Sequence, residues 1–353
     1  MSQDTFRKLQ QCLDRLSLGF PPTDSGIEIE ILRKLFSDRD AALFLALSPR
    51  LETAEDVAAR LSRDTGETAE HLRDMASRGL LFTLRKGETV KYGQIPFVHG
   101  LFEFQLTRLD RELSEMLERY FHEAFYDAVT RGVAAFLRTV PVRESLDVSH
   151  HVAAYEDAAE ILRSQPRIVV AECICRKQQA LLGKGCGKPR EVCFMFGSMG
   201  QYYLDHGLGR EVGLEEAVRL LKEAQDAGLV TQPATAQNPG GMCNCCGDCC
   251  SVLRALRLHP KPSEMVFSNY TAVVDPEACT GCGACLHRCQ MSAIAIDKLE
   301  RAGIDRDRCI GCGLCATACP VEAIRMFPKE EQRVPPPGTM EQMLNMARLR
   351  GLA

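Results

Sequence analysis

Apolar residues in the first third of the chain recur at helical spacing in three segments, and then alternate with polar residues in two short segments. Thr53 stands where it can cap the second segment, and Gly79 ends the third. The turn residues Lys86 and Gly87 separate the two alternating segments. The pattern therefore predicts three helices, over residues 28–47, 54–61 and 68–78, followed by a hairpin of strands over residues 80–84 and 90–95.

A longer amphipathic pattern follows over residues 106–139 and ends before a proline. We expect a helix that packs between domains, because its large apolar side chains share one stripe. Further along, the apolar residues 168–171 predict a strand and residues 214–227 predict a helix. Near the C-terminus, Pro-rich residues 335–338 predict a stiff hinge, and residues 340–349 predict a short helical tail that could dock on a partner.

The chain has 353 residues, a net charge of −4 and 18 cysteines. In a long chain that begins with charged residues instead of an apolar leader, cysteines at metal-type spacing predict reduced thiolate ligands rather than disulfides. The longest apolar run, residues 41–47, is too short to cross a membrane. We therefore expect a cytoplasmic protein without membrane insertion.

Eight cysteines near the C-terminus fall into two runs of identical spacing. In each run, three cysteines separated by two residues are followed by a fourth after three more. Three such thiolates can wrap three corners of a cubane iron-sulfur cluster, but the fourth corner must be reached from elsewhere. Zinc needs four ligands and has no use for two triplets with a trailing fourth. The runs are Cys279, Cys282, Cys285 and Cys289, and Cys309, Cys312, Cys315 and Cys319.

The two runs are halves of an internal repeat, since Asp275 and Asp305, among others, pair at a constant offset. Residues 270–328 resemble a bacterial-type ferredoxin domain with two 4Fe-4S clusters. The family usually has proline after the first run, where this chain has Gln290. The resemblance implies that the fourth cysteine of each run crosses to the other cluster. Cluster 1 would be held by Cys279, Cys282, Cys285 and Cys319, and cluster 2 by Cys309, Cys312, Cys315 and Cys289.

Nine further cysteines lie in two groups between residues 168 and 250, beside polar neighbours such as Asn244 and Asp248. Three interpretations fit: a further iron-sulfur cluster assembled from both groups, a structural zinc site, and a redox-active dithiol. The segment also resembles a loosely defined group of cysteine-rich iron-sulfur proteins of anaerobic bacteria, through C-x-C-R-K, P-x-E-x-C-F and C-N-C-C, which implies metal binding. The candidate ligands are Cys173, Cys175, Cys186, Cys193, Cys243, Cys245, Cys246, Cys249 and Cys250.

The three helices and hairpin resemble a winged helix-turn-helix domain over residues 1–105. This part has 14 Lys and Arg against 16 Asp and Glu, whereas a DNA-reading surface needs an excess of cations. We therefore expect a docking or dimerisation module, which could form a homodimer, and no DNA binding. His150 and His151 lie in a polar stretch without a metal-binding frame, so we expect them to be solvated.

The predicted fold is multidomain, mainly α with α+β parts. It has a winged-helix-like domain (1–105), a helical cysteine-rich middle (106–260), a two-cluster ferredoxin domain (261–330), and a Pro hinge with a helical tail (331–353). The predicted function is electron transfer to or from a redox partner protein through two 4Fe-4S clusters, with a further iron-sulfur or zinc centre in the middle. The alternatives are a redox-sensing winged-helix regulator and an oxidoreductase whose middle centre binds substrate.

Overall fold

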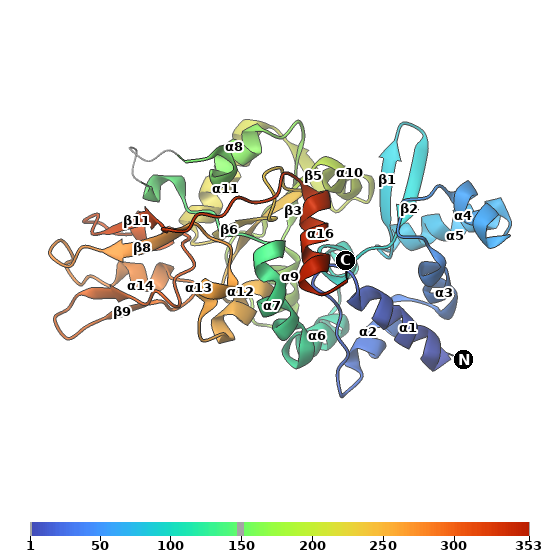
Figure 1. Cartoon of the computed structure of the whole chain (residues 1–353), viewed down its shortest axis with the longest axis horizontal. Helices are drawn as coiled ribbons and strands as arrows, with labels where there is room; N and C mark the ends of the chain where they lie inside the picture. Colours follow the sequence, from blue (N-terminus) through green and yellow to red (C-terminus); the bar gives the residue numbers. More distant parts are fainter. Residues whose placement is uncertain (1, 147–151, 353) are drawn as a thin grey trace.

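The computed structural model describes residues 2–146 and 152–352. It mixes helices and sheets, with 46% of the residues helical and 17% in strands. The N-terminal helices lie at one end of the molecule and the ferredoxin-like region at the other, with the middle region between them (Figure 1). Every helix among the described residues is too short or too polar to cross a lipid bilayer. His150 and His151 lie outside the described residues.

The N-terminal part contains the helices and the hairpin in the predicted order. The single helix predicted over residues 28–47 is two helices, because Ser37 and Asp40 form a capping box that starts a new helix. Thr53 caps the next helix as predicted. The winged-helix resemblance itself remains a prediction. The elements are α1 (Ser2–Asp14), α2 (Ile27–Leu35), α3 (Asp38–Ala46), α4 (Ala54–Leu61), α5 (Thr65–Ser77), β1 (Phe82–Lys86) and β2 (Thr89–Gly93).

The β1–β2 hairpin packs against α10 (Gly197–Asp205) of the middle region. The rings of Phe82 and Tyr202 stack with their centroids 5.4 Å apart. The Tyr202 hydroxyl donates to the carbonyl oxygen of Leu81 at 3.2 Å, and Arg85 pairs with Asp205 at 3.2 Å. The hairpin is therefore anchored to the rest of this chain.

The long amphipathic segment forms helical structure from residue 111 onward. It begins later than predicted, because the Asp110 side chain accepts the N–H of Leu113 and caps the helix there. Its apolar stripe is buried as expected. The segment consists of α6 (Arg111–Tyr120), the π-type turn η3 (Phe121–Phe125) and α7 (Tyr126–Phe136). Before it lie the irregular turn η1 (Phe97–Leu101) and η2 (Glu103–Gln105).

The middle region is not simply helical as predicted, because it contains a five-stranded antiparallel sheet in the order β5-β3-β4-β7-β6. Three cysteines occupy strand positions, where a free thiol packs as a small apolar side chain. The strands are β3 (Ile168–Glu172), β4 (Glu191–Phe196), β5 (Gly209–Val212), β6 (Val230–Pro233) and β7 (Gly241–Cys245). The other elements are η4 (Arg143–Ser145), η5 (Ala154–Glu156), α8 (Ala158–Arg163), α9 (Ile174–Leu181), α11 (Leu214–Asp226), α12 (Ser251–Leu258) and α13 (Pro262–Met265).

The ferredoxin-like region repeats a strand, a short helix and a strand. The first strand of the first half pairs with the last strand of the second half, so the two halves interlock. The elements are β8 (Tyr270–Val274), α14 (Ala284–Arg288), β9 (Ile294–Ile296), β10 (Ala302–Ile304), α15 (Leu314–Thr317) and β11 (Ile324–Pro328). The two antiparallel pairs are β8 with β11 and β9 with β10.

The Pro-rich segment and the tail helix α16 (Thr339–Leu349) pack on this chain itself. Residues 237–238 donate their backbone N–H groups to the carbonyl oxygens of Pro336 and Pro337, at 2.8 and 3.1 Å. Gln342 donates to the carbonyl oxygen of Phe136 in α7 at 2.7 Å. The predicted hinge is therefore fixed in place, and the partner on which the tail docks is α7.

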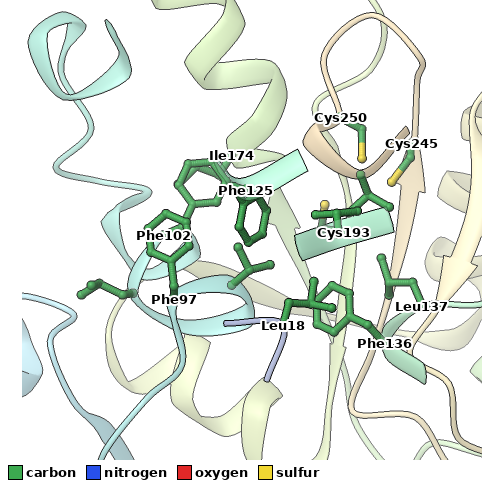
Figure 2. Packing of buried hydrophobic residues seen from close by; sticks show 14 of the residues in the cluster. Leu18, Phe97, Phe102, Phe125, Phe136, Leu137, Ile174, Cys193, Cys245 and Cys250 are labelled. Atoms are coloured by element: carbon green, nitrogen blue, oxygen red, sulfur yellow. The ribbon is translucent and has the colours of Figure 1, made fainter. Parts of the chain in front are cut away.

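A shared apolar core joins the N-terminal part to the cysteine-rich middle. Figure 2 shows Phe97 close to Phe102 and Phe125, and Phe136 beside Leu18 and Leu137, with Cys193 and Cys245 in the same cluster. Burial of these aromatic side chains fixes the position of the segment that leads into α6, and therefore of the polar residues on it.

Candidate metal centres

The eight C-terminal cysteines line two separate cavities in the ferredoxin-like region. Each cavity takes three cysteines from one run and the fourth from the other run, as the ferredoxin arrangement implies. We name them cage 1, lined by Cys279, Cys282, Cys285 and Cys319, and cage 2, lined by Cys309, Cys312, Cys315 and Cys289. Four thiols around a cavity match the ligand requirement of one cubane.

Glycines shape the loops around both cages in a matching way. Gly281 and Gly311 have φ of 70° and 72°, in the left-handed region. A Cβ on Gly281 would lie 2.1 Å from the carbonyl oxygen of Glu300, and one on Gly311 would lie 2.2 Å from that of Tyr270. Only glycine therefore fits where each loop passes under a neighbouring strand or turn.

Backbone amides also approach the cysteine sulfurs in the same way in both halves. The N–H of Ala293 donates to Cys289 Sγ at 3.2 Å, and the N–H of Ala323 donates to Cys319 Sγ at 3.2 Å. Such hydrogen bonds favour the thiolate form and help to set the reduction potential of a bound cluster. The residues present thus fit a pair of 4Fe-4S clusters in donor type, number and surroundings.

Cage 1 lies nearer the solvent than cage 2. Cys282 of cage 1 is exposed, whereas Cys309 and Cys315 of cage 2 are each 9% exposed. Burial raises the pKa of Cys312 to about 12. The positive charge of a bound metal would therefore be needed to stabilise its thiolate form. The carbonyl oxygen of Cys312 accepts the N–H of Val142 at 3.1 Å, which attaches cage 2 to the middle region.

A second contact joins cage 2 to the middle cysteines. The buried Gln290, next to Cys289, accepts the N–H of Gly247 on its amide oxygen at 2.7 Å. A Cβ on Gly247 would lie 2.6 Å from the carbonyl oxygen of Gln290, so the two backbones also pack closely. Gly247 follows Cys246 directly. The residue that departs from the ferredoxin pattern is therefore the one that contacts the loop that carries Cys246 and Cys249.

The nine middle cysteines form two sets, and both sequence groups contribute to each set. The first set has sulfur atoms within 4.8 Å of one another, with the Cys186 and Cys246 sulfurs 3.7 Å apart. Two thiolates on one tetrahedral metal ion lie about 3.8 Å apart, because metal–sulfur bonds are about 2.3 Å long. The contact with Cys249 lowers the pKa of Cys246 to about 6. We name this set the triad: Cys186, Cys246 and Cys249.

For each of the other six cysteines, two neighbouring thiols of the same set are the main cause of a shifted thiol pKa, so the six side chains interact in a closed circuit. Unlike the triad, no three of their sulfur atoms lie within 4.8 Å of one another among the described residues. Four of them are buried and two are partly buried. We name this set the hexad. In circuit order it consists of Cys173, Cys175, Cys250, Cys245, Cys243 and Cys193.

Arg176 lies between the triad and the hexad and is only 2% exposed. Its guanidinium donates to the carbonyl oxygens of Pro189 and Asn244, at 2.8 to 3.0 Å. Burial by itself would lower the pKa of Arg176, but the negative charges of Cys173 and other thiols of both sets raise it. Among the described residues, no carboxylate pairs with this buried cation. The thiols of the two sets are therefore the groups that can balance its charge.

The N-terminal part also contributes polar groups to the hexad, which the sequence analysis missed. His99 has a left-handed backbone, with φ of 37°, and hydrogen-bonds Cys243. Burial raises the pKa of the nearby Glu103 to about 7, and its carboxylate accepts the N–H of Gly100 at 3.0 Å. His99 is separated from Cys243 by more than a hundred residues, so no spacing could have revealed the pair.

Two family models, both described as a 4Fe-4S dicluster domain, match the C-terminal part of the chain, over residues 272–326 and 308–346. The first match contains both cysteine runs, and the second contains only the later run. No curated protein and no solved structure matches the chain. The C-terminal region is therefore a ferredoxin-type region, and 4Fe-4S clusters are its cofactors.

Proposed function

We propose that this protein transfers electrons from a surface site at cage 1, through cage 2, to a metal centre in the middle region. The contact between Gln290 and Gly247 carries the proposal, because it connects the surroundings of cage 2 directly to the triad. When bound, the 4Fe-4S clusters supply one-electron transfer. The chain contributes the order of the centres and the distances between them.

The cysteine assignments within this proposal follow the cavity linings. Cage 1 would bind its cluster through the thiolates of Cys279, Cys282, Cys285 and Cys319, and cage 2 through those of Cys309, Cys312, Cys315 and Cys289. The exposure of Cys282 supports electron entry or exit at cage 1, where a redox partner protein can approach. The burial of cage 2 supports its role as an internal step.

A second function, an oxidoreductase with a substrate-binding middle centre, is favoured by the composition of the triad. Its three thiols would leave one position of a tetrahedral metal ion without a cysteine. An open position is what a substrate needs to bind a metal ion. In this version the ferredoxin-like region supplies the electrons for the reaction.

A DNA-binding regulator has less support from the contacts of the N-terminal part. Arg78 at the end of α5 donates to the buried Asp40 at 2.9 and 3.0 Å, and His71 contacts the same carboxylate at 2.8 Å. The hairpin is anchored to α10 through Tyr202 and Asp205. These groups are therefore occupied within the chain, which favours a docking role for this part.

Metal analysis of the full-length protein, purified without oxygen, tests the proposal. Two cubanes account for about eight irons and eight sulfides per chain, and iron above that number supports a redox-active middle centre. A paramagnetic signal after chemical reduction is expected from the ferredoxin-like region. Zinc in place of iron in the middle region would end the electron path at cage 2. Full metallation without a paramagnetic signal on reduction would refute electron transfer altogether.

A further inference from the structure

The six cysteines of the hexad come from strands β4 and β7 and from the N-terminal ends of helices α9 and α12. Phe194 of β4 pairs antiparallel with Met242 of β7. Cys193 precedes Phe194 and Cys243 follows Met242, so the two cysteines stand next to this pair and opposite each other across the two strands. Cys245 lies two residues beyond Cys243 and therefore shares its face of the sheet. The starts of α9 and α12 supply the remaining members, Cys173, Cys175 and Cys250.

The number of thiols exceeds what one small metal site can use. One tetrahedral ion takes four thiolates, and one cubane also takes four. The hexad places six in one circuit, and the triad uses none of them. A single centre that engages the whole circuit must therefore contain more than one metal ion.

A buried cation lies beside the hexad. Arg176 carries a buried positive charge that no carboxylate balances among the described residues. Thiolates can balance it, but several thiolates in contact repel one another unless cations lie between them. Thiophilic metal ions bound inside the circuit would separate such thiolates.

His99 gives independent support for a built site. Its left-handed backbone is costly for a residue with a side chain, and such strain persists where the surroundings over-determine the geometry. Its ring packs on Phe136 with the centroids 4.6 Å apart and hydrogen-bonds Cys243. This geometry holds a polar ring against one thiol of the circuit, as second-layer partners of metal ligands do.

We propose that the hexad binds a polynuclear centre of thiophilic metal ions, separate from any metal held by the triad. Zinc and iron both suit an all-thiolate site, so the ligand chemistry is shared and the metal has to be identified by experiment. His99 acts as a positioning residue beside Cys243. The inference does not depend on the direction of electron flow through the ferredoxin-like region.

The test compares single substitutions in the two sets, made in the full-length protein and purified without oxygen. Cys193→Ser alters the hexad, Cys249→Ser alters the triad, and Cys12→Ser is the control, because Cys12 is a buried cysteine of α1 outside both sets. Iron, zinc and sulfide are counted per chain for each variant and for the double variant. The paramagnetic signal of the reduced ferredoxin clusters is recorded alongside.

We expect Cys193→Ser to lose two or more metal ions that Cys249→Ser retains, and the double variant to lose both sets. Cys12→Ser should keep the metal content of the parent protein, and all variants should keep the ferredoxin signal. Loss of sulfide together with iron would identify an iron-sulfur centre, and loss of zinc without sulfide a thiolate-bridged zinc centre. Equal losses in both single variants with no further loss in the double variant would show one joint centre and overturn the proposal.

Folding has to be separated from ligation. If Cys193→Ser alters the far-UV circular dichroism spectrum, Cys175→Ser replaces it, since that side chain is only partly buried at the start of a helix. His99→Gln should keep the metal count and shift the absorption of the hexad centre, a change that a purely packing role would not cause. A parent protein without any metal beyond the ferredoxin irons would also overturn the proposal, and would leave electron transfer through the two cages intact.

Discussion

At the scale of single residues, Gln290 joins two regions through one hydrogen bond. Its amide oxygen accepts the N–H of Gly247, and proline, which stands at this place in most ferredoxin domains, has no side-chain acceptor. The side chain thus orders the loop between Cys246 and Cys249 against cage 2. The residue at which the chain departs from the family pattern therefore makes a specific contact in the structure.

Gln290→Pro should leave both ferredoxin clusters in place and slow electron transfer to the middle centre severalfold. The substitution leaves the buried N–H of Gly247 without an acceptor, at a cost of about 1–3 kcal/mol, which displaces the triad loop. Rapid mixing with a low-potential reductant, followed by freeze-quench paramagnetic resonance, measures the rate. Gln332→Leu serves as the control, because that glutamine hydrogen-bonds only to Asn269 and Lys329. Unchanged rates in Gln290→Pro would show that the contact plays no part in transfer.

Gly311→Ala should destabilise cage 2 and reduce the iron content by up to one cluster. The left-handed backbone would cost about 1–2 kcal/mol, and the new Cβ would overlap the backbone oxygen of Tyr270, which cannot move without disturbing β8. Gly303→Ala is the matched control, since the nearest atom to its Cβ lies 3.9 Å away. Iron counts and thermal unfolding of both variants test the prediction. Equal stability of the two would contradict the role given to Gly311.

At the scale of secondary structure elements, Glu118 holds three helices together. It lies on α6 and accepts hydrogen bonds from Arg254 of α12, at 2.6 and 2.8 Å, and from Gln179 of α9 at 2.8 Å. Burial by itself would raise the pKa of Glu118, but these partners outweigh it and hold the pKa at about 2. The helices that begin beside Cys175 and Cys250 are therefore fixed by an ion pair outside the thiol sets.

The pH dependence of this ion pair has a definite sign. The folded pKa lies below the usual carboxyl value of 4.5, so the stabilisation is fully present above pH 4.5 and is lost as the pH falls toward 2. Glu118→Gln should lower the free energy of unfolding by about 2–3 kcal/mol at pH 7. Urea unfolding of the parent protein and of Glu118→Gln can be followed by tyrosine fluorescence. The difference between their urea midpoints should be constant from pH 7 to 5 and should become smaller below pH 4.5. A difference in urea midpoint that grows as the pH falls would contradict the low pKa of Glu118.

Helices and the cysteine spacing were accessible from the sequence, because their patterns are local. Thr53 caps the N-terminus of α4 as predicted, and the apolar stripe of α6 and α7 is buried. Of the sheet in the middle region only the strand over residues 168–171 was predictable, since the strands that contain Cys193, Cys243 and Cys245 are interrupted by cysteines, which carry no period-2 signal of their own. The break before α3 was missed because the capping pair Ser37 and Asp40 interrupts an otherwise continuous apolar pattern.

At the scale of the whole molecule, the centres follow an order that no local pattern could give. Cys282 of cage 1 is exposed, Gln290 beside cage 2 hydrogen-bonds Gly247 of the triad loop, and Arg176 interacts with thiols of both the triad and the hexad. The ferredoxin-like region lies at one end of the chain's fold (Figure 1). The crossing of the fourth cysteines was predictable from the family. The division of the nine middle cysteines was not, because strands and helix starts from distant segments decide it.

This order predicts that blocking cage 2 separates the two ends of the path. Cys312→Ser should remove the cluster of cage 2, so that cage 1 is still reduced at the parent rate while the middle centre stays oxidised. Cys282→Ser, at the exposed side of cage 1, should instead slow the reduction of every centre by a protein donor. Stopped-flow absorbance with a reduced ferredoxin as donor, combined with iron counts, distinguishes the two variants. If the middle centre of Cys312→Ser is reduced as fast as in the parent protein, electrons enter it by another route, and cage 2 is not an obligatory step.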